Sequence, residues 1–314
     1  MNEIALLSTM AAMTSIAFNR EHDVDYGACE QLTPLIRRVT ANNPSPFTFK
    51  GTGTYIIGRG EVAVIDPGPD DEAHLQALLQ ALGAERVSHI LVTHTHSDHS
   101  GLVPKFKAAT GAPVYAYATH TKNEGNIESG NVELDASADH DFKPDVELAH
   151  GDTIEGGDWT FEAVFTPGHM SNHMSFALPQ EKALFAGDHV MAWSTSVIAP
   201  PDGRMSDYMA SLDLLLTRDD EIYWPTHGGP VHDPKPFVQA FIEHRQAREH
   251  AILERLAAGD DTISDMVPKI YQGVDPKLFP AAAMSLLAHM EYLVEKGDVT
   301  TNDAPNVQAS YQMV

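Results

Sequence analysis

The segment Leu91–Gly101, with the sequence LVTHTHSDHSG, constrains the fold and the chemistry of this chain more than any other. It places His94, His96, Asp98 and His99 directly after an apolar run. Such a run is typical of a buried strand, and α/β proteins place their chemistry on the loops that leave strand ends. Imidazole and carboxylate groups suit zinc, and also manganese or iron. We expect His94 and His96 to bind one divalent ion, and Asp98 and His99 to bind a second.

Two side chains are too few to hold a divalent ion, so the cluster needs further ligands from elsewhere in the chain. Three later apolar runs each end in Gly or Pro next to one metal-binding side chain, namely His169, Asp188 and His227. We expect His169 to complete the ligands of the first ion and His227 those of the second. The two carboxylate oxygens of Asp188 allow it to bridge the ions. The sequence therefore predicts a dinuclear metal site.

Six of the other histidines are interpreted as ordinary surface or core residues, because a chain with 17 histidines contains many that bind no metal. This interpretation covers His120, His140, His150, His232, His244 and His250. The single cysteine, Cys29, excludes both an intrachain disulfide and a cysteine-based metal site. The absence of disulfides fits a reducing compartment.

The first half of the chain shows alternating strand and helix patterns. We expect strands at Thr54–Ile57, Val62–Ile65 and Val87–Val92, and helices at Asp71–Leu82 and Leu102–Thr110. This alternation predicts a layered α/β architecture.

Apolar runs in the second half continue this pattern and then change to helical spacing. Strands are expected at Phe161–Phe165, Met174–Leu178 and Ala183–Phe185, followed by a long helix at Phe237–Leu256. The segment Ala257–Val299 contains helix-length apolar patterns, which predict a small helical domain of the winged-helix type.

Charge and hydropathy limit what the protein binds and where it works. The net charge is −24, and so acidic a surface repels phosphate backbones, which argues against broad nucleic-acid binding. No run reaches the ~18–20 apolar residues of a membrane span. Ile4–Phe18 is apolar but lacks a basic start, so we interpret it as an N-terminal helix or strand rather than a secretory signal. We therefore expect a cytoplasmic protein with a small-molecule substrate, and the sequence leaves its oligomeric state open.

Taken together, the metal-binding motifs resemble those of the metallo-β-lactamase superfamily over roughly Thr52 to Gly229. The matching motifs are His94-x-His96-x-Asp98-His99, Gly168-His169, Gly187-Asp188 and His227-Gly228. The resemblance implies a four-layered αβ/βα sandwich, with two sheets face to face, helices outside and the metals at one edge. It also implies that Asp66 and His173 support the site without binding metal.

A narrower similarity links the chain to the lactamase-β-2-like branch of that superfamily. It rests on Asn43–Tyr55, Pro200–Gly203 and His244–Glu249. We accordingly expect a catalytic domain over residues 1–234 and a winged-helix-like domain over residues 235–314. Gly53 stands where Asn is common in the branch and Thr226 where Gly is common, and neither departure removes a metal ligand.

The resemblance also implies a reaction. Two ions held close together lower the pKa of a shared water, and the bridging hydroxide attacks an electrophilic carbonyl or phosphorus. Asp98 is expected to be catalytic, binding one metal and orienting the nucleophile by accepting its proton.

Three substrate classes stay open, namely a small ester, thioester or lactone, a β-lactam, and single-stranded RNA, which an endoribonuclease of the same branch cleaves. We favour the first, because dedicated β-lactamases usually lack a carboxylate at the position of Asp188. From Lys235 to Asp298 the chain has seven Lys and Arg against ten Asp and Glu, a net charge of −3. The C-terminal part is therefore no evident phosphate-binding platform.

The segment Pro200–Tyr208 lies between the Asp188 and His227 motifs, and we expect it to line the substrate side of the site. The candidate substrate contacts are Trp193, Arg204 and Tyr208. Arg245 and Arg248 on the long helix are interpreted as structural residues that attach the tail to the sandwich.

Overall fold

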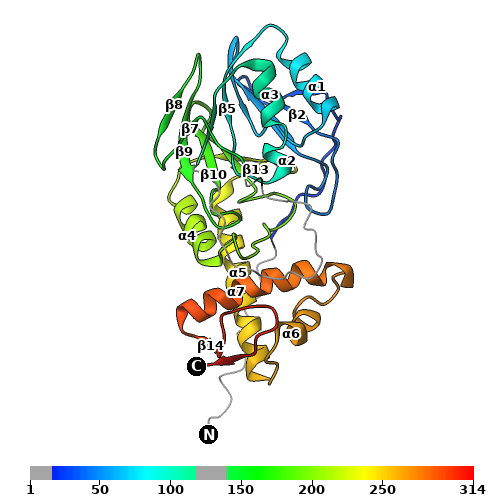
Figure 1. Cartoon of the computed structure of the whole chain (residues 1–314). Coiled ribbons are helices and arrows are strands. Elements are labelled where there is room, and N and C mark those ends of the chain that lie inside the picture. The colour runs from blue at the N-terminus through cyan, green and yellow to red at the C-terminus, as the bar shows by residue number, and fades with distance from the viewer. Residues whose placement is uncertain (1–15, 118–138, 140) are drawn as a thin grey trace.

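The computed structural model describes residues 16–117, 139 and 141–314. Within this part of the chain, two β-sheets stack face to face and helices cover the outer side of each sheet (Figure 1). The predicted element at Ile4–Phe18 lies outside the described residues up to position 15, and positions 16–18 form neither helix nor strand. His120 and His140 also lie outside the described residues.

The strands of the first sheet follow chain order. They are β1 (Cys29–Gln31), β2 (Ile36–Thr40), β3 (Gly53–Ile57), β4 (Glu61–Ile65), β5 (Arg86–Leu91), β6 (Val114–Ala116) and β7 (Val146–Glu147). Strands β1 to β4 pair antiparallel, whereas β4 to β7 pair parallel. The carboxyl ends of β4 and β5 therefore lie at the same edge of the sheet, where side chains that follow them can meet.

The second sheet has the order β13-β12-β11-β10-β9-β8. Its strands are β8 (Thr153–Glu155), β9 (Thr160–Phe165), β10 (Met174–Leu178), β11 (Ala183–Gly187), β12 (Ile222–Pro225) and β13 (Val231–His232). β10 is antiparallel to both β9 and β11, and β11 is parallel to β12, so β9, β11 and β12 run in the same direction. Their carboxyl ends share one edge.

Helices cover both outer faces. On the first sheet lie α1 (Glu72–Leu82), the single turn α2 (Ser97–Ser100) and α3 (Val103–Thr110). On the second sheet lie α4 (Met205–Leu216) and the start of α5 (Pro234–Ala257). A 3-10 turn, η1 (Pro179–Glu181), joins β10 to β11. Helix α1 begins because the Asp71 carboxylate accepts a hydrogen bond from the Ala73 amide at 2.7 Å. It ends at Gly83, whose φ of +56° suits glycine.

Alternating side chains in the strands build the layers. In β3, Tyr55 and Ile57 pack between the two sheets, whereas Ile56 packs against the α1 and α3 layer. In β11, Phe185 packs between the sheets and Leu184 packs against the α4 and α5 layer. The four-layered αβ/βα sandwich expected from the sequence is confirmed.

The C-terminal unit contains α6 (Ile263–Ile270), the 3-10 turn η2 (Pro276–Leu278), α7 (Phe279–Lys296) and a hairpin of β14 (Val299–Thr301) with β15 (Tyr311–Met313). Helix α5 runs from the sandwich into this unit (Figure 1). Its Val238 and Phe241 pack in the core of the sandwich, whereas its Ile252 packs in the core of the C-terminal unit. The expected boundary between residues 234 and 235 thus falls at the start of a helix that both units share.

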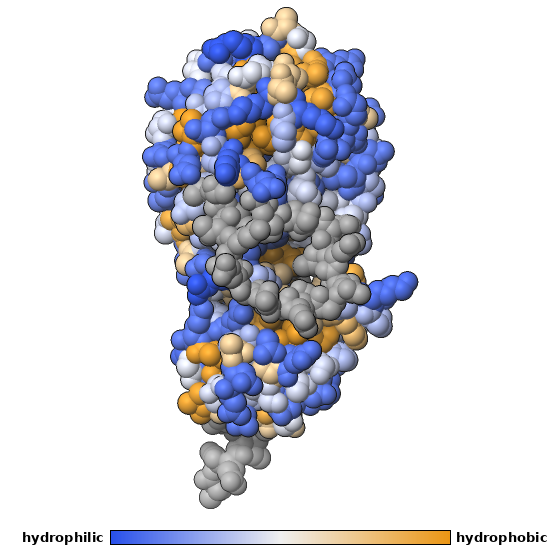
Figure 2. Space-filling view, in the orientation of Figure 1, coloured by the Kyte–Doolittle hydropathy of each residue, from blue (hydrophilic) through white to orange (hydrophobic). Residues whose placement is uncertain are grey.

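Hydrophilic side chains cover most of the described surface that faces the viewer in Figure 2, on the sandwich and on the C-terminal unit alike. Large hydrophobic side chains are exposed at a few described positions, among them Tyr26, Val146 and Leu278. No helix within residues 16–117 and 141–314 is both long and apolar enough to cross a bilayer.

Candidate metal centre

The seven predicted ligands converge at the edge of the sandwich where the parallel strands of both sheets end. Four of them follow β5, and α2 begins directly after His96, so that the next two donors belong to its single turn. His169 follows β9, Asp188 follows β11 and His227 follows β12. Strands far apart in sequence thereby deliver all seven side chains to one place.

His94, His96 and His169 form a first group of donors. Nδ1 of His96 lies 2.9 Å from Nε2 of His94 and 3.1 Å from Nε2 of His169. Imidazole nitrogens at this separation bring lone pairs together unless a proton or a cation lies between them. Zinc–nitrogen bonds of ~2.0–2.1 Å in a tetrahedral site require nitrogens only slightly farther apart. The group therefore has the size and the donor chemistry of one metal position.

Asp98, His99 and His227 form a second group. Oδ2 of Asp98 lies 3.1 Å from Nε2 of His227 and 3.4 Å from Nε2 of His99. Asp188 reaches both groups, because its Oδ2 lies 3.4 Å from Nε2 of His227 and 3.8 Å from Nε2 of His169. Its Oδ1 lies 3.6 Å from Nε2 of His99. A carboxylate placed between two groups of donors is arranged to bridge two ions.

Buried polar atoms without partners also fit a cation. Nε2 of His99 and Oδ1 of Asp188 are buried and have no hydrogen-bond partner among the described residues. Unsatisfied buried polar atoms are costly, and a cation between them would satisfy both. Together with His94 they form a set whose ligand atoms all lie within 4.8 Å of one another. The donors thus fit one or two divalent ions.

The two groups differ in charge. Burial lowers the pKa of His227, but the carboxylates of Asp188 and Asp98 outweigh it and raise that pKa to about 10. At the first group, burial and the neighbouring ring of His169 lower the pKa of His96 to about 3. His96 in the first group is therefore a neutral imidazole ready to bind a metal, whereas in the second group a proton on His227 compensates the carboxylates and a divalent cation would take its place.

Asp66 supports the second group from behind. It follows β4 with φ at +49°, a left-handed conformation that aspartate tolerates better than most residues. Its Oδ2 lies 2.8 Å from Nδ1 of His99 and accepts hydrogen bonds from the hydroxyls of Thr93 at 2.8 Å and Thr226 at 2.9 Å. Contacts of this kind orient a ligand ring and raise its basicity.

The far nitrogens of two other rings have similar partners. Nδ1 of His169 lies 2.6 Å from the main-chain oxygen of Val197, and Nδ1 of His227 lies 3.2 Å from that of Gly51. Because a carbonyl oxygen can only accept, each ring donates from Nδ1 and keeps Nε2 for the cluster.

His173 lies behind Asp188. Its Nε2 accepts a hydrogen bond of 3.2 Å from the Asp188 amide, and its Nδ1 lies 2.9 Å from the Thr166 hydroxyl. Gly187 has φ at +52°, and a Cβ there would lie 2.4 Å from Nε2 of His173. The residue before Asp188 therefore has to be glycine. His173 thus contacts the main chain of Asp188, and Asp66 the ring of His99, while their supporting role at a metal stays a prediction.

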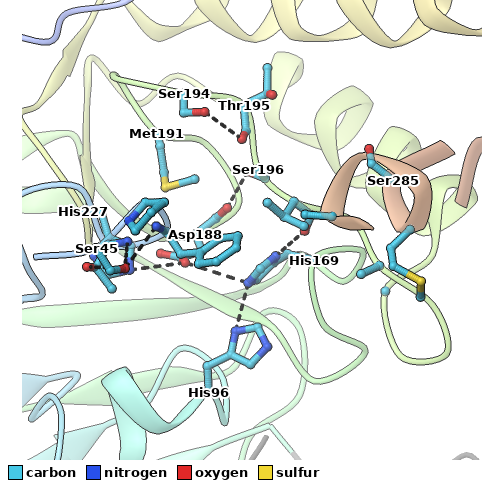
Figure 3. Close-up of a pocket in the computed structure, with 18 of the residues that line it drawn as sticks. Ser45, His96, His169, Asp188, Met191, Ser194, Thr195, Ser196, His227 and Ser285 are labelled. Carbon is cyan, nitrogen blue, oxygen red and sulfur yellow. Dashed lines mark hydrogen bonds and ion pairs between the residues drawn. The ribbon is translucent and has the colours of Figure 1, made fainter. Parts of the chain in front are cut away.

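A cavity of about 1090 Å³ extends from the cluster to the C-terminal unit. Figure 3 shows His96, His169, Asp188 and His227 pointing toward one another at one end, and Ser285 of α7 on the opposite side. Between them the wall is largely apolar, with side chains that include Phe47, Met170, Met191 and Trp193. The cavity thus leads from the donors into an apolar space bordered by α5 and α7.

Trp193 lines this cavity, as expected from the sequence. Its ring stacks on Phe49, with the ring centroids 4.8 Å apart and an interplanar angle of 10°. The stack lies against Gly228, where a Cβ would be 3.0 Å from Trp193. The glycine after His227 therefore leaves room for the indole beside the cluster.

The other two predicted substrate contacts do not line the cavity. Arg204 precedes α4 and forms an ion pair with Glu295 of α7, 2.6 Å away. Tyr208 is completely buried, and its hydroxyl donates to the main-chain oxygen of His189 at 2.9 Å. The prediction was wrong for these two residues, because α4 begins at Met205 and turns Tyr208 into the core, and because Arg204 pairs with α7.

The histidines interpreted as ordinary residues lie outside the cluster wherever the structure describes them. His150, His232 and His250 are exposed, and His250 lies 3.3 Å from Glu254 on the same helix. His244 is half-buried and lines the helical wall of the cavity.

Sequence reasoning missed the two threonines that bind Asp66 and the aromatic partner of Trp193. Thr93 directly precedes His94, and this position in the sequence could have identified it as a signal of the site. Thr226 had been noted as a departure from glycine, and its hydroxyl supplies the contact to Asp66. Phe49 had none, because its φ of +56° and its stacking arise only in the folded chain.

Comparison with protein families gives two matches along the chain. Residues 48–227 match the model of the metallo-beta-lactamase superfamily, and residues 262–306 match that of the beta-lactamase associated winged helix domain. The first match contains all seven candidate ligands, and the second contains α6, α7 and β14.

Individual proteins agree with these matches. A beta-lactamase-like protein 2 homolog of Drosophila melanogaster is 31% identical over 280 residues, which cover 86% of this chain and 91% of that protein. An atrochrysone carboxyl ACP thioesterase of Aspergillus fumigatus is 33% identical over 238 residues, 73% of this chain and 67% of that one. The crystal structure of a metallo-beta-lactamase family protein from Thermus thermophilus superposes with a TM-score of 0.75 at 26% identity, covering 90% of this chain and 100% of that one.

Proposed function

The chain belongs to the metallo-β-lactamase superfamily and is a metal-dependent hydrolase, and we propose that it hydrolyses a thioester of a small acyl group. The reaction would use two divalent ions, for which we prefer zinc to manganese or iron. The observation that carries the proposal is the position of Asp188 between two complete groups of donors. The thioesterase among the relatives supports the choice of thioester over other esters and lactones.

The donor set supports zinc. Five of the seven candidate ligands are imidazoles, which suit zinc better than they suit magnesium or calcium. When bound, the two ions would lower the pKa of a water between them and polarise the substrate carbonyl.

The chain's own residues orient the reactants. Oδ2 of Asp98 belongs to the second group and also lies 3.3 Å from the Thr52 hydroxyl. That contact leaves Oδ1 for a water at the cluster, so Asp98 can accept the proton of the attacking water. Asp188 fixes the distance between the two groups, and Asp66 holds the ring of His99.

The cavity supports an acyl substrate. Met170, Met191 and Trp193 offer apolar surface to an acyl chain next to the donors. A thioester carbonyl can then sit at the cluster while the rest of the substrate extends toward α5 and α7. This placement buries the acyl chain against apolar side chains and leaves the reacting carbon at the donors.

The two alternative substrates have less support. A single-strand-specific endoribonuclease would need positive charge along the nucleic acid, whereas the C-terminal part has a net charge of −3. Carboxylates like Asp188 are usually absent from dedicated β-lactamases. The endoribonuclease keeps the support of the branch resemblance, with which the beta-lactamase-like protein 2 homolog agrees, whereas the β-lactamase has no specific observation in its favour.

One preparation tests the proposal. Metal content is measured together with turnover of an acyl thioester, a lactone, a chromogenic cephalosporin, a phosphodiester and a single-stranded RNA. We expect roughly two divalent ions per chain and thioester turnover that falls at least ~10³-fold in Asp98→Asn.

The matched control is Asp219→Asn, a carboxylate that is 97% exposed and pairs with Lys235. It should leave turnover unchanged. Cleavage of RNA or of the cephalosporin that is lost in Asp98→Asn, with inert thioesters, would contradict the proposed substrate. Turnover that survives in Asp98→Asn would contradict the proposed site.

A further inference from the structure

Two arginines on the cavity wall have no carboxylate partner among the described residues, a feature that they share only with the exposed Arg20 and Arg59 among the described arginines. The chain has 44 Asp and Glu against 20 Lys and Arg. Ion pairs with carboxylates are formed by Arg37, Arg38, Arg86, Arg204, Arg218 and Arg255. Among the described residues, no carboxylate lies within 4.0 Å of Arg245 or Arg248. Both side chains lie on α5 and line the cavity.

Arg245 is committed to the protein. Its Nη2 donates to the main-chain oxygen of Ser196 at 2.6 Å, and its guanidinium lies 5.0 Å from the ring centroid of Tyr208. Only 3% of the residue is exposed, and Nε has no hydrogen-bond partner among the described residues. Arg245 therefore acts structurally, as interpreted from the sequence, and it adds an uncompensated positive charge behind the wall.

Arg248, one turn farther along α5, is partly open. Its Nη1 donates to the main-chain oxygen of Ile270 at 3.2 Å, and its guanidinium lies 4.2 Å from the ring centroid of Tyr271. Neither its Nε nor its Nη2 donates to a described residue, and both escape full burial. A guanidinium fixed on one side and free on the other is suited to a planar or tetrahedral anion.

The surroundings of Arg248 are positive. Burial, with help from Arg245 and Arg248, lowers the pKa of the neighbouring His244 to about 4. Outside the donor cluster, the two carboxylates that line the cavity have partners of their own. Asp202 accepts from the amide and the hydroxyl of Ser171, and Asp70 pairs with Lys105 at 2.6 Å.

We propose that Arg248, backed by Arg245, forms an anion-binding subsite on the helical wall of the cavity, which recognises a carboxylate or phosphate on the part of the substrate that does not react. The inference rests on the proposed function, because it names a further feature of the same substrate. The scissile carbonyl sits at the donor cluster, and the anion reaches α5 near Tyr271. The two units of the protein then bind opposite ends of one molecule.

Two pairs of thioesters test the subsite and distinguish its possible anions. Hexanoyl-pantetheine and hexanoyl-4′-phosphopantetheine differ only in a phosphate on the thiol side. Hexanoyl-pantetheine and adipoyl-pantetheine differ only in a carboxylate on the acyl side. We expect the anionic member of one pair to have a kcat/KM about tenfold or more above that of the neutral one, as one charge-assisted contact supplies.

Arg248→Gln should remove this preference while turnover of hexanoyl-pantetheine stays within about twofold, which also reports that the variant is folded. Arg248→Lys should keep part of the preference for the anionic thioester, because lysine retains the positive charge but lacks the paired donors of a guanidinium. The matched control is Arg255→Gln, on the same helix, whose partner is Asp260 at 2.6 Å. Equal kcat/KM within both pairs, or a preference that survives in Arg248→Gln, would overturn the subsite.

A binding experiment separates this inference from the proposed function. If no thioester turns over, adipate and inorganic phosphate are titrated calorimetrically into the metal-loaded protein. Binding that is lost in Arg248→Gln and kept in Arg255→Gln would support the subsite even then. Absence of binding, or binding that is unchanged in Arg248→Gln, would overturn it.

Discussion

Oδ2 of Asp66 lies 2.8 Å from Nδ1 of His99, and the two residues are brought together by the parallel pairing of β4 and β5. An ionised carboxylate only accepts hydrogen bonds, so the proton of the His99 ring lies on Nδ1. Nε2 is then free for the second group of donors. We therefore expect Asp66 to determine which nitrogen of His99 faces a metal, without binding the metal itself.

Asp66→Asn should lower the metal affinity of the second group by roughly 10–100-fold, because an amide can present a donor to Nδ1 and favour the wrong tautomer. Asparagine tolerates the left-handed backbone at this position, so the fold should be kept. Competition with a fluorescent chelator measures the affinity. Asp145→Asn, whose carboxylate pairs with Lys107 far from the cluster, is the control. Wild-type affinity in Asp66→Asn would contradict the role given to Asp66.

Removal of metal should lower the melting temperature by roughly 10 °C, because a ligand present at about 1,000 times its Kd contributes about 4 kcal/mol. The buried carboxylates of Asp98 and Asp188 lose their compensating charge at the same time. Differential scanning fluorimetry before and after dialysis against a chelator measures the shift. Zinc should restore the melting temperature and magnesium should not, since magnesium prefers oxygen ligands. An unchanged melting temperature would count against a metal at these donors.

Trp193→Ala should raise KM for a thioester about tenfold, as the loss of a buried aromatic contact of this size does. Trp193→Phe should retain most of the affinity, because a phenyl ring can still stack on Phe49. Arg204→Ala serves as the control and should leave KM unchanged, since Arg204 pairs with Glu295 outside the cavity. A raised KM in Arg204→Ala with a normal KM in Trp193→Ala would reverse the assignment made from the cavity.

Glu291 should make the protein less stable at alkaline pH. Burial, with the nearby Glu295, raises its pKa from 4.5 to about 7 in the folded state. The folded state therefore binds this proton more tightly than the unfolded chain does. The resulting stabilisation is complete below pH 4.5 and is lost as the pH rises through 7.

Glu291→Gln removes this titration. The variant should exceed the wild type in unfolding free energy by about 1–2 kcal/mol at pH 8.5, after allowance for solvent screening of a partly exposed group, and by less at pH 5.5. Urea unfolding at the two pH values measures the difference. Glu254→Gln, an exposed carboxylate beside His250, should show no such change. A pH-independent difference would exclude Glu291 as its source.

The sequence was sufficient for the core of the sandwich and for bringing the candidate ligands together, because both follow from local signals. Each donor stands at the end of an apolar run, and the ends of parallel strands meet at one edge. β2 was not predicted, since its Arg37 and Arg38 interrupt the apolar pattern although both are buried. Their charges are compensated by Glu85 and Glu30, which no local pattern reveals.

The substrate side was harder to predict, because it depends on which way a helix turns its side chains. Tyr208 was predicted to contact the substrate, whereas it lies in the core of the sandwich. Gly53, a departure from the branch, also acquires a reason only in the fold. A Cβ there would lie 2.9 Å from Cδ of Arg38 and 3.2 Å from the main-chain oxygen of Thr226. Both positions depend on contacts between distant segments.

Helix α5 decides how far the chain can be divided. The first family match ends at residue 227 and the second begins at residue 262, so neither contains this helix. A fragment that stops before α5 would lack Val238 and Phe241 in the core of the sandwich. A C-terminal fragment that starts after α5 would lack Ile252 in its own core. The first cut would also remove Arg245, which donates to the main-chain oxygen of Ser196. The second cut would separate the cavity from the residues of α7 that line it. A chimera with another member of the family would have to exchange α5 together with both units, because the helix belongs to the core of each.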